Sequence, residues 1–198
     1  MTRPVPACFA AALAATLASG CASAPALPDR IAGHLAEAPE DVPARLVLSG
    51  SSIVQAAVAV GPGAIPAPVR AAISAVVPQG DVTFQGREWG PRGFGFRIEK
   101  RYVHEAIEHT RTALIAPDGD VLERAHSVPI GQVPKPILTA ALQAGSTVTT
   151  ALIVSGPDAE EGWRCHVTDR LGRRYLVEVD LGGTLTAVHR RVAANVDV

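Results

Sequence analysis

An internal repeat with a period of about 68 residues constrains the fold of this chain more than any other feature. Residues 63–69 (GAIPAPV) return as residues 131–137 (GQVPKPI), 68 positions later. A second pair of segments, 93–98 (GFGFRI) and 162–167 (GWRCHV), recurs at a spacing of 69 residues. A fixed spacing of this kind indicates that one supersecondary unit is built twice.

Each copy begins with a helical pattern and continues with strand patterns. Apolar residues follow the prolines at helical spacing, over residues 69–77 in the first copy and 137–142 in the second. The prolines suit the first turn of a helix, because their fixed φ and missing N–H carry little cost there. In the second pair of repeated segments, apolar residues alternate with polar residues or glycine, which is typical of a strand with one buried face. Earlier strands are expected at 82–84 and 148–154.

A two-residue turn signal occurs three times between strand patterns. Residues 50–51 (GS), 118–119 (DG) and 182–183 (GG) tolerate the positive φ that a tight hairpin needs. Their spacings of 68 and 64 residues keep the period of the repeat. The predicted order is therefore hairpin, helix, two strands, hairpin, helix, two strands, hairpin.

The last hairpin carries the pattern Tyr-x-Val-x-Val-Asp-x-x-Gly over residues 175–183, and residues 113–122 hold a looser copy. A helix followed by an antiparallel meander that ends in such a hairpin resembles the PepSY and PepSY-like family. Tandem units of this kind also resemble the β-lactamase-inhibitor-protein fold. The first copy departs from the pattern, because Arg111 stands where the second has Tyr175. The resemblance covers residues 61–195 and implies an α+β fold class, with two repeated helix-plus-antiparallel-sheet units preceded by an extra N-terminal β-hairpin.

The N-terminal residues resemble a bacterial lipoprotein signal peptide with its lipobox. The apolar run over residues 7–17 is shorter than the roughly 20 residues that cross a membrane as a helix. Ala18, Ser19 and Gly20 then precede Cys21, although the lipobox pattern prefers Leu at the position of Ala18. The resemblance implies cleavage between Gly20 and Cys21 and a lipid on Cys21. An ordinary secretory peptide cut elsewhere, or a disordered Ala-rich start, is the alternative.

Four segments follow from these patterns. We expect a lipoprotein signal peptide, an Ala/Pro-rich tether, an N-terminal hairpin with the first PepSY-like unit, and the second PepSY-like unit. Their boundaries are 1–20, 21–44, 45–129 and 130–198.

Location and partners follow from the lipobox and the charge. No aspartate follows Cys21, where Ala22 and Ser23 stand, and in a bacterium with two membranes this implies the periplasmic face of the outer membrane. In a bacterium with one membrane, the same anchor implies the outside of the plasma membrane. The formal net charge of −1 argues against nucleic acid as a partner. We expect the membrane, through the lipid anchor, and another envelope protein as partners, and no cofactor.

Residues 104–109 (HEAIEH) come close to a zinc-protease motif but miss its spacing. The HExxH motif places two imidazoles one helical turn apart, whereas here Glu108 stands at the fourth position after His104 and His109 at the fifth. The segment is instead expected to be the tip of a hairpin over about 100–111, longer than its counterpart and projecting into water. Since loops on a rigid sheet are common contact sites, we predict that His104, Glu105, Glu108 and His109 contact a partner.

Cys165 is expected to be an inert core residue rather than a nucleophile. Its neighbours in the alternation are Trp163 and Val167, and a buried apolar setting makes a thiol unreactive. His166 falls on the opposite, polar face of the same strand. No catalytic motif emerges, so we expect a non-enzymatic binding or inhibitory module, as the PepSY resemblance implies. The alternative is an envelope-assembly or scaffolding lipoprotein of the outer membrane.

Overall fold

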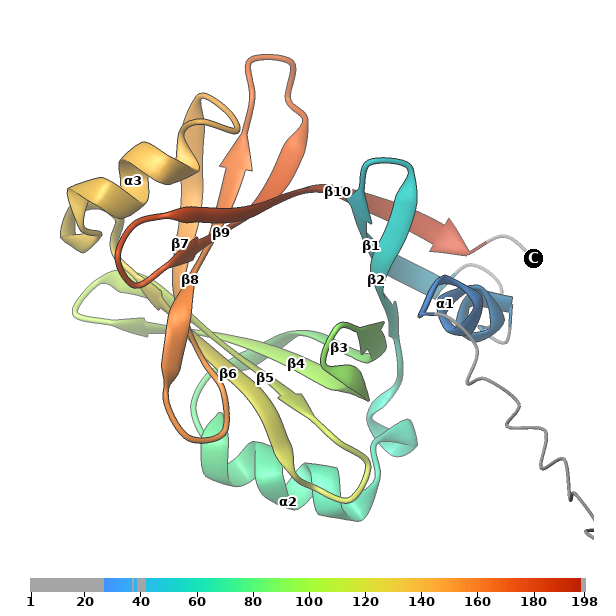
Figure 1. The fold of residues 1–198 in the computed structure, drawn as a ribbon. Helices are drawn as coiled ribbons and strands as arrows, with labels where there is room; N and C mark the ends of the chain where they lie inside the picture. The colour runs from blue at the N-terminus through green and yellow to red at the C-terminus, as the bar shows by residue number, and fades with distance from the viewer. Residues whose placement is uncertain (1–26, 37, 39–41, 197–198) are drawn as a thin grey trace, which may run out of the picture.

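The chain forms a closed barrel of ten antiparallel β-strands (Figure 1). Each strand pairs with the strand that follows it in the chain, and β1 pairs with β10 to close the ring. Hairpins or short helical connections join the successive strands. A computed structural model describes residues 27–36, 38 and 42–196. The barrel is therefore an up-and-down meander without a free sheet edge among these residues.

The strands are seven to twelve residues long, and the helices are short. The strands are β1 (Val42–Ser49), β2 (Ser52–Ala59), β3 (Asp81–Gly90), β4 (Gly93–His104), β5 (Ile107–Ile115), β6 (Val121–Val128), β7 (Thr147–Ser155), β8 (Glu160–Thr168), β9 (Arg174–Asp180) and β10 (Leu185–Val196). The helices are α1 (Leu27–Ala36), α2 (Ala67–Val76) and α3 (Lys135–Ala141), with 3₁₀ turns η1 (Pro62–Ala64) and η2 (Ile130–Gln132).

The largest hydrophobic clusters lie outside the barrel, between its wall and the helices. Around α2, Val69 and Val77 pack with Ile98 and Ile115 of β4 and β5. Around α3, the cluster joins the helix to the outer faces of β7, β8 and β9; its buried members are Val133, Ile137, Ala140, Ala141, Ala151, Trp163, Cys165, Val167, Val177 and Val179. The sequence has apolar residues at helical spacing in the helices and at alternate positions in the strands. Each pattern gives one apolar face, and the two kinds of face pack against each other.

The inner face of the barrel carries many charged side chains, next to apolar ones such as Phe84, Leu152 and Leu176. In β8, Trp163, Cys165 and Val167 point outward to α3, so Arg164 and His166 point into the lumen. In β4, Ile98 packs under α2, whereas Arg97 and Glu99 line the lumen. The barrel thus carries its apolar cores on the outside and charged side chains within.

The individual helices, strands and turns agree with the sequence patterns. Both proline-led helices are present as α2 and α3, each with a proline in its first turn. The three turn signals join β1 to β2, β5 to β6 and β9 to β10. Gly119 and Gly183 have φ values of +103° and +92°, which favour glycine. A Cβ on either would meet a helix-entry proline, Pro68 or Pro136 respectively, so both copies of the repeat share this contact.

The expected architecture, however, was wrong. An α+β fold of two PepSY-like helix-plus-sheet units was predicted, and the structure is a single closed antiparallel barrel that is mostly sheet. The units do not separate because β6 pairs with β7 across their boundary, with Ala125 opposite Val154. The N-terminal hairpin is not an addition to the fold either, since Leu46 of β1 pairs with Val192 of β10 and closes the ring.

The segment expected to be a tether contains α1. Ile31 is buried, and Leu35 packs against the cluster of Ala44 and Val58 on the outer face of β1 and β2. The lipobox, including Gly20 and Cys21, lies outside the described residues. Among the helices that are described, none is both long enough and apolar enough to span a membrane.

Candidate functional site

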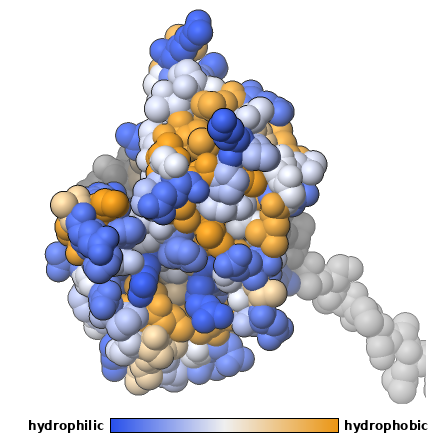
Figure 2. All heavy atoms as spheres, turned by 90° about the vertical axis from the view of Figure 1, so that its left-hand side faces the viewer, coloured by the Kyte–Doolittle hydropathy of each residue, from blue (hydrophilic) through white to orange (hydrophobic). Residues whose placement is uncertain are grey.

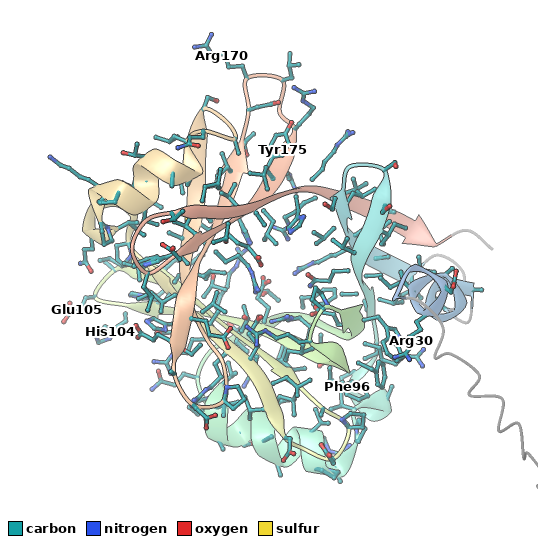
Figure 3. All side chains as sticks on the ribbon, viewed as in Figure 1. Arg30, Phe96, His104, Glu105, Arg170 and Tyr175 are labelled. Carbon is teal, nitrogen blue, oxygen red and sulfur yellow. The ribbon has the colours of Figure 1, made fainter. Side chains whose placement is uncertain are left out.

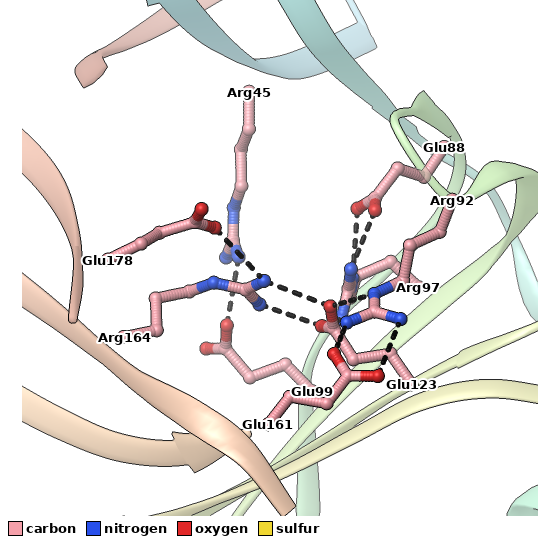
Figure 4. Close-up of polar contacts among 9 residues, drawn as sticks. All are labelled: Arg45, Glu88, Arg92, Arg97, Glu99, Glu123, Glu161, Arg164 and Glu178. Carbon is pink, nitrogen blue, oxygen red and sulfur yellow. Dashed lines mark hydrogen bonds and ion pairs between the residues drawn. The ribbon is translucent and has the colours of Figure 1, made fainter. Parts of the chain in front are cut away.

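The lumen holds an ion-pair network centred on Glu123 of β6 (Figure 4). Glu123 is 1% exposed, and its carboxylate accepts hydrogen bonds from three arginines on three other segments. Arg164 of β8 donates from both terminal nitrogens, at 2.7 Å to Oε1 and 2.9 Å to Oε2. Arg97 of β4 donates to Oε1 at 2.7 Å, and Arg92 of the β3–β4 turn donates to Oε2 at 2.9 Å.

Two further carboxylates balance these arginines. Glu88 of β3 is buried and receives both Nε and Nη2 of Arg97, at 2.9 and 2.7 Å. Glu161, at the start of β8, forms an ion pair with Arg92. We call Glu88, Arg92, Arg97, Glu123, Glu161 and Arg164 the ion-pair network. Its three cations and three anions are formally neutral together, and most contacts are bidentate or charge-assisted, the strong geometry for such bonds.

The network fixes its own charge states. Burial alone would raise the pKa of the Glu123 carboxyl, but Arg97 and Arg164 outweigh burial and hold that pKa well below its ordinary range. Burial would likewise lower the pKa of the Arg97 guanidinium, and Glu88 and Glu123 raise it instead. Glu123 and the arginines bound to it therefore stay ionised, and their contacts make the network a structural cross-brace between β3, β4, β6 and β8.

A second group of charges lies toward the barrel end that carries the β4–β5 and β8–β9 turns. Four arginines gather there around a cavity of about 250 Å³ that His166 and Glu99 also line; they are Arg45, Arg101, Arg174 and Arg191. We call these four the mouth cluster. Glu99 accepts a hydrogen bond from Arg45 at 2.9 Å, and the exposed Glu108 lies 3.6 Å from Arg101. Four cations thus face two carboxylates.

Arg174 and Arg191 are the uncompensated members of the mouth cluster. They stand directly opposite each other in the β9–β10 pairing and line the same cavity of about 320 Å³. Neither side chain makes a hydrogen bond or ion pair with another residue in the part of the chain that the structure describes. Burial, and next to it Arg45, lower the pKa of the Arg191 guanidinium, and the nearby Glu99 offsets them only in part. Like charges directly opposite in a sheet are destabilising, so this pair favours an anion between or beside it.

His166 of β8 lines both of these cavities and the lumen as well. Burial, and then Arg191, Arg164 and Arg45, lower the pKa of its imidazole to about 3. The ring is therefore neutral near pH 7 and makes no hydrogen bond with the described residues. A neutral imidazole offers one N–H donor and one acceptor nitrogen, which complements guanidinium groups that only donate.

Of the predicted contact residues, His104, Glu105 and His109 lie apart from the mouth cluster at the tip of the β4–β5 hairpin, whereas Glu108 lies 3.6 Å from Arg101 of that cluster. Glu105 and Ala106 form the two-residue turn of this hairpin with φ values of +51° and +63°. Figure 3 shows His104 and Glu105 pointing away from the barrel. The prediction of a longer, water-exposed hairpin is confirmed, since β4 and β5 reach twelve and nine residues against nine and seven for β8 and β9.

The hairpin tip presents both ring and apolar surface. The His109 ring stacks on Tyr102 with centroids 5.2 Å apart and lies 6.3 Å from that of His104. Val103 is 72% exposed and Ile107 is 41% exposed. Figure 2, which views the molecule from the left of Figure 1, shows hydrophobic residues on this face interrupted by hydrophilic ones. No three His, Cys, Asp or Glu side chains of the described ranges are grouped so that they would hold a metal ion.

Cys165 is fully buried under α3, as predicted. Burial raises the pKa of its thiol to about 11, so the reactive thiolate is scarce near neutral pH. The residue belongs to the outer core and not to the lumen.

The lumen was missed from the sequence, although a signal for it exists. Arg97, Glu99 and Arg101 place charges of both signs at alternate positions of one strand, and Arg164 and His166 do the same on another. Such alternation describes a polar face but does not say whether that face meets bulk water or the inside of a barrel. Charges of opposite sign on the polar faces of several strands were the available hint.

Comparison of the sequence with protein-family models and with curated proteins finds no match.

Proposed function

We propose that this chain is a membrane-anchored, extracytoplasmic binding module that holds a small anionic ligand at the mouth cluster. The observation that carries the proposal is the cross-strand pair Arg174–Arg191, two arginines opposite each other without a carboxylate partner among the described residues. The adjoining cavities of about 250 and 320 Å³ lie at the small end of the roughly 300–1,000 Å³ range of ligand sites. They suit a compact anion or the charged headgroup of a larger molecule.

Binding rather than catalysis is supported by the groups around the cluster. Arginines supply donors only, and a guanidinium does not act as a base. The His166 imidazole, with a pKa of about 3, is a poor general base near neutral pH. Glu99 keeps its carboxylate paired with Arg45, which holds the pKa of Glu99 below its ordinary value against the effect of burial.

Titration calorimetry of the purified full chain in detergent tests the binding proposal. We expect an oxyanion such as phosphate to bind, and Arg191→Gln to weaken that binding at least tenfold, since one charge-assisted contact is worth about 1.5–3 kcal/mol. Glu178→Gln is the matched control, because Glu178 contacts Arg164 only at 3.6 Å and is partly exposed. Binding that survives Arg191→Gln unchanged would contradict the proposal.

The anchor has its own test. Replacement of Cys21 by Ala should move the protein from the membrane fraction to the soluble envelope fraction, because two or more acyl chains are what make lipid anchoring stable. A Cys21→Ala protein that stays in the membrane pellet after a carbonate wash would overturn the lipoprotein interpretation. We place the anchored protein at the periplasmic face of the outer membrane, on the same lipobox reasoning.

A scaffolding role in envelope assembly is a second candidate, favoured by the exposed hairpin tip. Val103 and Ile107 present apolar surface beside His104, Glu105, Glu108 and His109. Replacement of residues 103–108 by a short Gly-Ser turn should remove a partner protein from the material that co-purifies after detergent extraction. Unchanged recovery of partners would exclude the tip as a contact site.

A further inference from the structure

The mouth cluster combines two kinds of hydrogen-bonding group that select among anions. Arg174 and Arg191 present donors on one strand pair, and His166 adds a ring beside them, since all three line one cavity. Thr149 and Thr168 bring hydroxyl groups to the same cavity. The Thr149 hydroxyl already donates to the backbone carbonyl of His166 at 3.1 Å, so it offers an acceptor lone pair but no free proton.

His166 differs from the arginines because its ring can accept a hydrogen bond as well as donate one. Its strand position fixes it: Val167 and Cys165 on either side face the core under α3, so the ring is held on the lumen side. Because neighbouring cations and burial keep the ring neutral, it carries an unprotonated nitrogen. That nitrogen can accept a hydrogen bond. The donors of Arg174 and Arg191 would already be used by the bound anion, so the hydrogen bond to His166 would have to come from the ligand.

We infer that the ligand of the mouth cluster is a phosphate group that retains a proton, with its anionic oxygens on Arg174 and Arg191 and its P–OH donating to the imidazole of His166. This inference rests on the proposed anion-binding function and specifies it. Hydrogen phosphate carries both anionic oxygens and a hydroxyl donor. Sulfate has the same tetrahedral shape but no proton near neutral pH, so it would leave the acceptor nitrogen of His166 unsatisfied.

The discrimination is expected to be substantial. A site that hydrogen-bonds a substrate hydroxyl rejects an analogue without it, because the polar group of the site is then buried unpaired. We expect phosphate to bind about tenfold or more tightly than sulfate at pH 6.5. His166→Leu should abolish this preference, whereas His166→Gln, which keeps an amide oxygen as an acceptor, should retain part of it.

Calorimetric titration of the full chain with inorganic phosphate, sulfate and methyl phosphate tests the inference. Phosphate preferred over sulfate, with the preference lost in His166→Leu, supports it. Tighter binding of methyl phosphate than of inorganic phosphate indicates an esterified phosphate as the source, whereas tighter binding of inorganic phosphate indicates free phosphate.

Three results would overturn the inference. Equal affinity for phosphate and sulfate, both dependent on Arg191, leaves the anion-binding function standing and refutes the role of His166. A phosphate preference that persists in His166→Leu refutes that role as well. Failure of every anion to bind refutes the proposed function together with the inference.

Discussion

The lumen contains two groups of arginines that differ in how their charge is balanced. In the ion-pair network, Arg92, Arg97 and Arg164 converge on the single carboxylate of Glu123 at 2.7–2.9 Å, and Glu88 and Glu161 complete the balance. In the mouth cluster, by contrast, Arg174 and Arg191 oppose each other across two strands without such a partner.

This difference indicates that the charges of the ion-pair network stabilise the fold, whereas those of the mouth cluster are available to a ligand. The ion-pair network braces the fold, because removal of one partner would leave a buried charge uncompensated. One donor in it, Nε of Arg164, has no hydrogen-bond partner among the described residues. Repulsion between unbalanced arginines lowers the free energy of unfolding. A bound anion would offset this repulsion. Arg45 is intermediate, since it pairs with Glu99 and also lies over the ring of Phe84 at 3.8 Å.

Loss of the central carboxylate should have the largest effect. Glu123→Gln leaves three arginines short of one negative charge, and breaking a buried pair of this kind costs about 3–5 kcal/mol. Denaturant unfolding measures the loss. Glu178→Gln, on the same side of the lumen but partly exposed, should change the free energy of unfolding by less than about 1 kcal/mol. A Glu123→Gln protein as stable as the control would refute the bracing role of the network.

Acid should destabilise the mouth through His166. The pKa of this imidazole is about 3 in the folded state and about 6.5 in the unfolded chain, so unfolding takes up a proton at pH values between them. Stability from this group is therefore present above pH 6.5 and is lost as the pH falls, by up to about 1.4 kcal/mol per pH unit.

Unfolding experiments between pH 6.0 and 5.5 measure this slope, because Glu123 and Glu99 contribute mainly at lower pH, where the unfolded chain protonates its glutamates. His166→Gln should reduce the slope by close to one proton. An unaltered slope in His166→Gln would show that the imidazole is not held neutral by the cluster.

The same substitution in the two arginine groups should act in opposite directions. Arg164→Gln removes a bidentate partner of Glu123 and should cost about 3–5 kcal/mol. Arg191→Gln relieves a like-charge pair and should be neutral or stabilising by about 0.2–1 kcal/mol in anion-free buffer. Comparable losses in the two variants would mean that the groups do not differ, and the comparison between them would fail.

The hairpin tip should contribute least to stability. Replacement of residues 103–108 by a short Gly-Ser turn removes exposed side chains and the last pairs of the β4–β5 ladder. The change in the free energy of unfolding should stay within about 0.5 kcal/mol, as for other exposed sites. A loss of several kcal/mol would place the tip in the core of the fold instead of at a contact surface.

Local patterns predicted the strands, the hairpins and the helices α2 and α3 correctly, but they missed α1 and predicted the architecture wrongly. The turn at 118–119, the proline-led entry of α2 and the strand at 148–154 depend on neighbouring residues, so periodicity and turn chemistry are sufficient to find them. Closure of the barrel depends on pairs such as Leu46 with Val192, which lie far apart in the chain. No local pattern encodes such a pairing.

The site was hidden for a related reason. The alternation around Cys165 identified the apolar face of β8 correctly, and Cys165 is buried as expected. The opposite face, with Arg164 and His166, was expected to be an ordinary polar surface, whereas in the closed barrel it lines a lumen. Once the ring closes, each polar face meets the polar faces of the other strands, and pairs such as Arg164–Glu123 form between segments far apart in sequence.

The central claim is that the mouth cluster has a positive charge awaiting an anion, whereas the ion-pair network is already neutral. The most direct measurement is the free energy of unfolding at constant ionic strength as chloride is replaced by phosphate, for the natural chain and for a variant with both Arg174→Gln and Arg191→Gln. An anion that binds only the folded state stabilises it by about 2.7 kcal/mol at 100 times its Kd. We expect this gain in the natural chain and its loss in the double variant. No gain in the natural chain, or an equal gain in both, would show that the mouth cluster does not bind the anion.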